Sequence, residues 1–151
     1  MKILKIILLV LLVAFVGIQF MPTECNQSDV VPQTDFMEVN HVPEGIQKQL
    51  KVSCYDCHSN NTKYPWYNTI QPIAWFLEGH IKEGKGELNF NEWGSYSNRR
   101  KNSKLKSIIS QIEDNKMPLK SYTFIHSNSI FTNTEKQEII KYFNQLKDSL
   151  N

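Results

Sequence analysis

A pentapeptide at residues 54–58, Cys-Tyr-Asp-Cys-His, constrains this chain more than any other feature of its sequence. On a helical turn, positions i and i+3 project to the same side, so the sulfurs of Cys54 and Cys57 can reach one bound group together. His58 follows directly and can bind a metal held against the same turn. Three kinds of site use such residues: a haem attached through two thioether bonds, a zinc clip, and a redox-active dithiol.

The rest of the sequence favours the haem among these three. Zinc normally takes four ligands, often from a second close pair, whereas His41, His80 and His126 are isolated from one another. A redox dithiol usually lies in a β-α-β context, and the chain shows no alternating apolar pattern of useful strand length. We therefore expect one covalently attached haem c with His58 as the proximal iron ligand. Zinc and the dithiol remain the alternatives.

The N-terminus carries an uncharged apolar run at residues 6–23, preceded by Lys2 and Lys5. Its 18 residues, at about 1.5 Å each in a helix, approach the roughly 30 Å hydrocarbon layer of a bilayer. Bulky side chains stand where cleavage of a signal peptide requires small ones. An uncleaved membrane anchor is therefore preferred, with a cleaved signal peptide as the alternative.

The charges around this run predict its orientation. Residues 21–47 contain five acidic side chains and no Lys or Arg, and basic residues favour the cytoplasmic side of a membrane. We expect everything after the run in the periplasm or extracytoplasmic space, held at the inner membrane by residues 6–23. The net charge of +2 comes from Lys2 and Lys5, so the remainder is neutral and no nucleic acid partner is expected.

The composition divides the chain into three parts: residues 1–22 as anchor or signal peptide, 23–40 as a tether, and 41–151 as one domain. Apolar residues recur at helical spacing in the last part, which predicts a small all-α domain around the haem. Gly84 and Gly86 are expected to end the second helix. The predicted helices start near Pro43, Pro72, Leu105 and Thr134, and the last has Gln137 completing a capping box.

The second axial ligand decides the use of a haem iron, because an occupied position favours electron transfer and an open one admits small ligands. Met117 is the first candidate, since Pro118 biases it away from helix and displays its thioether on a loop. His80, on an apolar helix stripe, is the alternative, and His126 is the third. Each also has an ordinary role available, as core filling for Met117 and as a hydrogen-bonding group for the histidines.

Other side chains near the motif are candidates for the haem surroundings. Trp66 and Trp75 offer flat surfaces for contact with the macrocycle, or belong to an ordinary core. Arg99 and Arg100 are the only arginines in the chain, and they suit either the haem propionates or a solvated surface. No coherent acid and base set is found for a reaction at the haem, so we expect no enzyme activity.

With the Cys-Tyr-Asp-Cys-His motif and the pair Met117 and Pro118, several further segments resemble the bacterial haem-binding domain family, small exported proteins related to cytochrome c. The resemblance covers about residues 41–147, and its most specific part combines Leu-Asn-Phe-Asn-Glu-Trp at 88–93 with Tyr-Pro-Trp-Tyr at 64–67. It implies covalent haem c, with His58 proximal and Met117 distal. The other segments that carry it are residues 54–60, 73–75 and 86–87, the pair Met117 and Pro118, and Tyr122.

We therefore expect a membrane-anchored monohaem c-type cytochrome that passes single electrons between redox partner proteins in the cell envelope. The alternative is a haem-based sensor or small-ligand-binding module with an openable sixth position. His126 departs from the family pattern in its surroundings, so no role is carried over to it. Cys25 is interpreted as a free or intermolecular thiol, and the packing of Phe90 and Trp93 over the haem edge is a hypothesis for residues 88–93.

Overall fold

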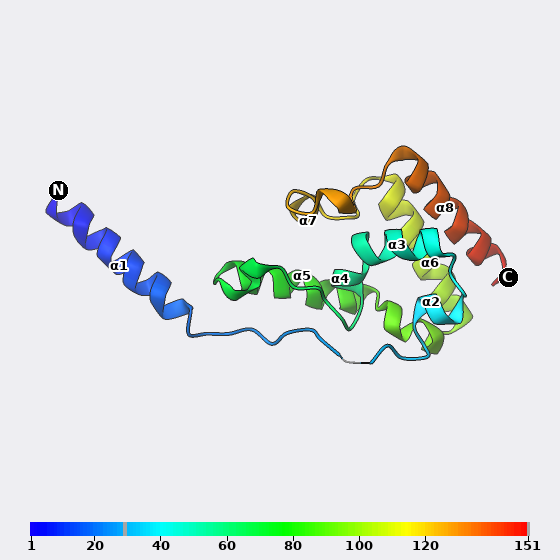
Figure 1. The fold of residues 1–151 in the computed structure, drawn as a ribbon, viewed down its shortest axis with the longest axis horizontal. Coiled ribbons are helices and arrows are strands. Elements are labelled where there is room, and N and C mark those ends of the chain that lie inside the picture. The colour runs from blue at the N-terminus through cyan, green and yellow to red at the C-terminus, as the bar shows by residue number, and fades with distance from the viewer. Residues whose placement is uncertain (29, 151) are drawn as a thin grey trace.

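In the computed structural model, residues 1–28 and 30–150 are described, and every regular element in this part of the chain is a helix (Figure 1). The all-α prediction is thereby confirmed. The α-helices are α1 (Lys2–Ile18), α2 (Phe36–Val39), α3 (Glu44–Ser53), α4 (Tyr55–His58), α5 (Ile73–Glu87), α6 (Asn98–Glu113), α7 (Lys120–Thr123) and α8 (Asn133–Asp148). Short 3-10 helices are η1 (Trp66–Thr69), η2 (Phe90–Ser95) and η3 (Ser127–Ser129).

Helix α1 contains most of the apolar N-terminal run and stands apart from the other helices in Figure 1. None of its 17 residues is buried. It ends at Ile18, whereas the predicted span continues to residue 23. The next residue, Gln19, donates from its Nε2 to the carbonyl oxygens of Phe15 and Gln71 at 3.0 and 3.1 Å. Within residues 1–28 and 30–150, no helix has both the length and the apolarity needed to cross a membrane.

The hydrophobic core lies where α3, α6 and α8 pack together, with α2 and η2 closing one side. Its centre is Phe36, whose ring centroid lies 5.2 Å from Phe90, 5.0 Å from Trp93 and 5.9 Å from Phe143. Full burial of each such side chain contributes about 1.5–3 kcal/mol. The core therefore fixes η2, which leads directly into the functional site.

Part of the predicted tether, residues 23–40, belongs to this core. Asp35 caps α2 by accepting a hydrogen bond from the backbone N–H of Met37 at 2.8 Å, and Phe36 and Met37 are buried. A single short helical turn carries too few apolar residues to show a period, so the sequence does not reveal it. The packed domain thus begins before residue 41.

Helix α5 runs through Gly84 and Gly86 to Glu87 instead of ending at the first glycine. Gly84 has a packing role: a Cβ placed there would lie only 2.9 Å from the backbone oxygen of Cys57. The glycine lets α5 approach α4 closely, and the prediction of a helix end at this residue was wrong for that reason.

Helix α8 begins two residues earlier than predicted. Thr132 is its N-cap and accepts from the backbone N–H of Glu135, and the Glu135 side chain accepts from the backbone N–H of Thr132 at 2.8 Å. The sequence contains two overlapping capping-box patterns, Thr132 with Glu135 and Thr134 with Gln137. The structure uses the first, whose carboxylate is a stronger acceptor than an amide at a helix N-terminus.

Candidate functional site

The Cys-Tyr-Asp-Cys-His motif forms helix α4, which follows α3 after Cys54 alone. The backbone N–H groups of Cys57 and His58 donate to the Cys54 carbonyl at 3.2 and 3.0 Å. This single turn places Cys54, Cys57 and His58 in the wall of one cavity, as the spacing of the motif predicts.

Two adjoining cavities open beside this turn, and both are lined by Cys54, His58 and Met117. Their volumes are about 200 and 260 Å³, which together fall in the range of roughly 300–1,000 Å³ typical of ligand pockets. The first is bounded by α5 and by residues 117–122, and the second by one face of α6 and by residues 87–90. The motif therefore lies where the two cavities meet, and their combined space is large enough for a flat cofactor.

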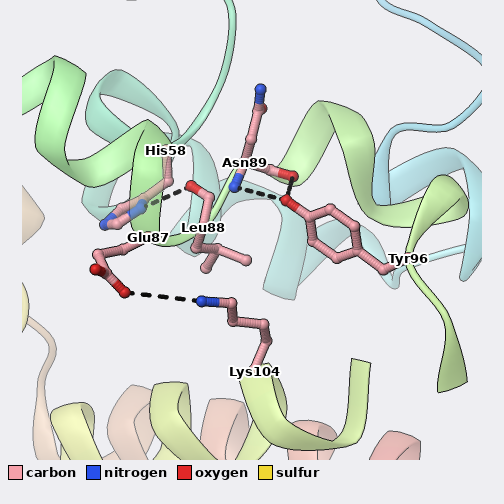
Figure 2. Close-up of polar contacts among 6 residues, drawn as sticks. All are labelled: His58, Glu87, Leu88, Asn89, Tyr96 and Lys104. Atoms are coloured by element: carbon pink, nitrogen blue, oxygen red, sulfur yellow. Dashed lines mark hydrogen bonds and ion pairs between the residues drawn. The ribbon is translucent and has the colours of Figure 1, made fainter. Parts of the chain in front are cut away.

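His58 is oriented by the backbone, since its Nδ1 lies 3.0 Å from the carbonyl oxygen of Leu88 (Figure 2). A carbonyl can only accept, so the proton resides on Nδ1 and Nε2 is left as an acceptor for a metal. Burial lowers the pKa of His58, which favours the neutral imidazole that binds metals. Histidines that ligate metals almost always donate their other N–H in this way.

The two motif thiols are poor nucleophiles in this setting. Burial raises the pKa of Cys54 to about 12 and that of Cys57 to about 11, so both are protonated at neutral pH. A redox dithiol needs a lowered pKa, which disfavours that alternative. Within the described residues, no three His, Cys, Asp or Glu side chains are grouped as ligands for a bare metal ion.

The segment at residues 88–93 supports the motif from the other side. Besides the Leu88 carbonyl that binds His58, the side chains of Leu88 and Phe90 line the second cavity. The Phe90 ring stacks on Tyr55 of the motif, with centroids 5.0 Å apart and planes 4° from parallel. Phe90 lines the cavity, as the hypothesis for this segment requires, whereas Trp93 is buried in the core.

The asparagines of this segment hold it in place. Asn91 donates to the buried carboxylate of Asp35 at 2.7 Å and accepts from the backbone N–H of Asn60 at 2.6 Å. The hydroxyl of Tyr96 bonds to the backbone of Asn89 at 3.2 Å (Figure 2). Burial raises the pKa of Asp35, although its hydrogen bonds, including one from Tyr55, oppose this. These polar contacts tie α2, α4 and η2 into one frame around the cavity.

Two of the three candidate distal ligands reach the cavity. Met117 lies at the junction, in the lining of both halves, and its backbone N–H donates to Gln111 at the end of α6 at 3.2 Å. His80 lines the first half, and its Nε2 is buried with no hydrogen-bond partner among the described residues. Its ring packs on Phe76 at a centroid distance of 4.4 Å.

His126, the third candidate, lies outside both cavities. Its Nε2 is 3.0 Å from the Tyr67 hydroxyl, and its ring stacks on Tyr122 at 4.4 Å. Tyr122 does line the first cavity, and its hydroxyl donates to Asp56 of the motif at 2.7 Å. His126 therefore supports the cavity wall through Tyr122 and is not directed at the space that a haem would fill.

The aromatic and arginine candidates are also placed elsewhere. Trp66 is 78% exposed, and neither Trp66 nor Trp75 is among the residues that line the two adjoining cavities. Arg100 lies over the Tyr96 ring, 3.9 Å from its centroid, and Arg99 is exposed at the start of α6. Proximity to the motif in sequence is the signal for the tryptophans, and charge is the signal for the arginines, but neither fixes the direction in which these side chains point.

Lys104 is a lining residue that the sequence interpretation missed. It belongs to the second cavity, and its Nζ lies 3.7 Å from Glu87, which lines both cavities (Figure 2). Ser107 and Gln111 lie on the same face of α6. Ser107 and Ile108 follow Lys104 by three and four residues, and Gln111 follows them by four and three. This spacing predicts that all four share one face of a helix.

The comparison with protein families agrees with this geometry. The model of a family described as a haem-binding domain matches residues 13–145, a range that contains every residue lining the two cavities. No curated protein and no solved structure matches the chain. The chain therefore belongs to the haem-binding domain family.

Proposed function

We propose that this protein is a monohaem c-type cytochrome that carries single electrons in the cell envelope and catalyses no reaction of its own. One observation carries the proposal: Cys54, Cys57, His58 and Met117 line one pair of adjoining cavities. Haem binding is a property of the family to which the chain belongs. Covalent attachment, electron transfer and location are the proposed parts.

The residues present fit a haem. A bound haem supplies an iron that gains or loses one electron. The sulfurs of Cys54 and Cys57 would hold the macrocycle, and the free Nε2 of His58 would ligate the iron because Leu88 occupies Nδ1. The thioether of Met117 is the proposed sixth ligand, with His80 as the alternative. A methionine in this position raises the reduction potential, which suits an electron carrier.

We also propose that the haem domain lies on the periplasmic or extracytoplasmic side of the cytoplasmic membrane. Lys2 and Lys5 precede the apolar stretch of α1, and the acidic residues follow it, which supports this orientation. Its redox partners would then be proteins of the same compartment.

Absorption spectroscopy of the reduced protein with and without carbon monoxide tests the proposal. We expect a six-coordinate spectrum that carbon monoxide does not change, and ready carbon monoxide binding would replace the electron carrier with the sensor alternative. Met117→Ala should abolish the methionine-to-iron charge-transfer band of the oxidised protein and open the site to carbon monoxide. Persistence of that band would remove Met117 as ligand.

Attachment is tested by acidic acetone extraction, which removes haem that is not covalently bound. The haem of the wild type should stay with the protein, whereas the haem of a Cys54→Ala/Cys57→Ala variant should be extracted. Extraction of haem from the wild type would contradict the c-type assignment while leaving haem binding itself intact.

A further inference from the structure

Exposed apolar side chains gather where α1 leads into the haem domain. We call them the exit patch, and they come from the chain after α1, from η1 and from the start of α5. Single exposed apolar residues are normal on a protein surface, but several that are held in the same region can mark an interaction site. The members of the exit patch are Phe20, Met21, Trp66, Ile73, Trp75 and Phe76.

Hydrogen bonds hold the exit patch together across a wide separation in sequence. Gln19 and Gln71 bond reciprocally, with Gln19 Nε2 donating to the Gln71 carbonyl at 3.1 Å and the Gln71 N–H donating to Gln19 Oε1 at 3.0 Å. The Met21 carbonyl accepts from Gln71 Nε2 at 3.1 Å and from Trp75 Nε1 at 3.2 Å. The start of α5 is thereby attached to the exit of α1, and η1 packs against α5.

The chain between α1 and the domain is docked rather than free. Asn26 donates to the Ser59 carbonyl at 2.9 Å and accepts from Lys85 Nζ at 2.5 Å, and its backbone N–H donates to the Tyr64 hydroxyl at 2.6 Å. Figure 1 shows this segment running beneath α5, with the end of α1 near the outer end of that helix. The exit patch therefore has a defined position next to α1.

The neighbouring helix indicates what covers the exit patch. Between Lys5 and Gln19, α1 is entirely apolar, and none of its residues is buried against protein. A surface of tryptophan and phenylalanine directly continuous with such a helix matches the aromatic belts that membrane proteins place at the boundary between lipid and water.

We propose that the exit patch is a lipid-binding surface that seats the haem domain against the bilayer beside α1. The inference rests on the proposed membrane association of α1 and is independent of which side chain ligates the iron. A second copy of this chain or a protein partner would cover the same atoms, and both are outcomes that the experiment separates from lipid.

Fluorine NMR of the full chain with reduced haem, in nanodiscs of phosphatidylethanolamine and phosphatidylglycerol, provides the test. The chain contains three tryptophans, and 5-fluorotryptophan labels Trp66 and Trp75 in the exit patch and Trp93 in the core. Gadolinium attached to lipid headgroups should broaden the signals of Trp66 and Trp75 several-fold more than that of Trp93. A dissolved gadolinium chelate should broaden Trp66 less in nanodiscs than the exposure of its side chain predicts.

Two results would overturn the proposal. If Trp66 responds to the dissolved chelate and not to lipid-bound gadolinium, the exit patch faces water. If it responds to neither, protein covers it. Phe76→Ser should reduce the lipid-bound effect on Trp66, whereas Ile130→Ser, an exposed apolar residue in a different segment, should not. The carbon monoxide spectrum of the same samples reports on the iron separately, so the lipid contact of the exit patch and the proposed iron ligation can fail independently.

Discussion

At the scale of single residues, the Leu88 carbonyl determines what His58 can do. The carbonyl belongs to a segment fixed by Asn89 and Asn91, so the imidazole cannot rotate away without breaking a buried contact. The protein thus prepares the Nε2 atom in advance of any metal, in the manner of the outer-shell partners of metal-binding histidines.

Lys104 should tune the reduction potential of the bound haem. Its charge already contributes to the lowered pKa of His58, after the larger effect of burial, so its field reaches the proposed ligand. A nearby positive charge disfavours the oxidised iron, and Lys104→Gln should lower the midpoint potential by an amount on the order of tens of millivolts. The substitution would also leave the negative charge of Glu87 unpaired, and this charge lowers the midpoint potential as well.

Redox titration measures this shift, with Lys106→Gln as the matched control because Lys106 lies on the same helix and is exposed. An equal shift in both variants would mean that only the net charge of the protein matters. A rise in potential for Lys104→Gln would contradict a position of Lys104 next to the bound haem.

At the scale of elements, the contact between α4 and α5 depends on Gly84. A Cβ at this position would lie 2.9 Å from a backbone atom of Cys57, which cannot move without distorting the motif. Gly84→Ala should therefore lower the melting temperature and the haem content, although alanine favours helix by roughly 1 kcal/mol over glycine. Gly86→Ala, with nothing within 4 Å of the added Cβ, should instead stabilise the protein by about 0.5–1 kcal/mol.

Thermal unfolding of the haem-loaded variants distinguishes the two effects. If both alanine variants gained stability, the close approach of α5 to the motif would not constrain the fold.

The cap of α2 gives the fold a dependence on pH. Burial raises the pKa of Asp35, so the folded state holds its proton more tightly than the unfolded chain, whose aspartates titrate near about 3.9. The contribution of Asp35 to stability is therefore complete below that value and is lost as the pH rises through the higher folded pKa. Asp35→Asn removes this titration.

Denaturant unfolding of both proteins between acid and neutral pH measures the effect. The stability of the wild type minus that of Asp35→Asn should decrease as the pH rises through the folded pKa of Asp35. A difference that does not vary with pH would show that the hydrogen bonds from Met37 and Asn91 balance burial, and one that increases would show that they outweigh it.

At the scale of the whole molecule, the sequence predicts the chemistry of the site better than its surroundings. Because Cys54 and Cys57 are three residues apart and His58 follows directly, the sequence alone predicts that all three side chains line the same cavity. The family match confirms haem binding. Trp66 and Trp75 are candidates because they lie near the motif in sequence, and His126 is one because it follows Met117, but η1, α5 and the turn after α7 direct them elsewhere. Their positions depend on tertiary packing, which no local pattern encodes.

The extent of the domain is the other feature that local patterns do not give. The early part of the chain was interpreted as a tether because it has prolines and no apolar period, but single residues in it form the decisive contacts. Phe36 completes the core, and Asn26 bonds to Ser59, Tyr64 and Lys85. An asparagine surrounded by polar neighbours looks the same in a linker and in a docked segment.

Removing the Asn26 side chain should release this segment. Asn26→Ala loses the bonds to Ser59, Thr62 and Lys85, so hydrogen exchange and protease cleavage within residues 19–28 should increase while the haem spectrum stays unchanged. Gln27→Ala, an exposed neighbour, is the control and should leave both unchanged. Unaltered exchange in Asn26→Ala would mean that the glutamine pair at residues 19 and 71 and the backbone bonds of residue 26 to Tyr64 and Thr62 suffice to hold the segment.

The docked segment would also determine how the protein meets the proposed electron partners. A free linker of about ten residues would let the domain wander over roughly 15–20 Å and turn any face outward, whereas residues 19–28 leave no slack. With α1 held in a membrane, the haem would stay at one height and in one orientation. The search for a partner would then be two-dimensional, and a partner would be selected by whether its own redox centre stands at the same level above the lipid.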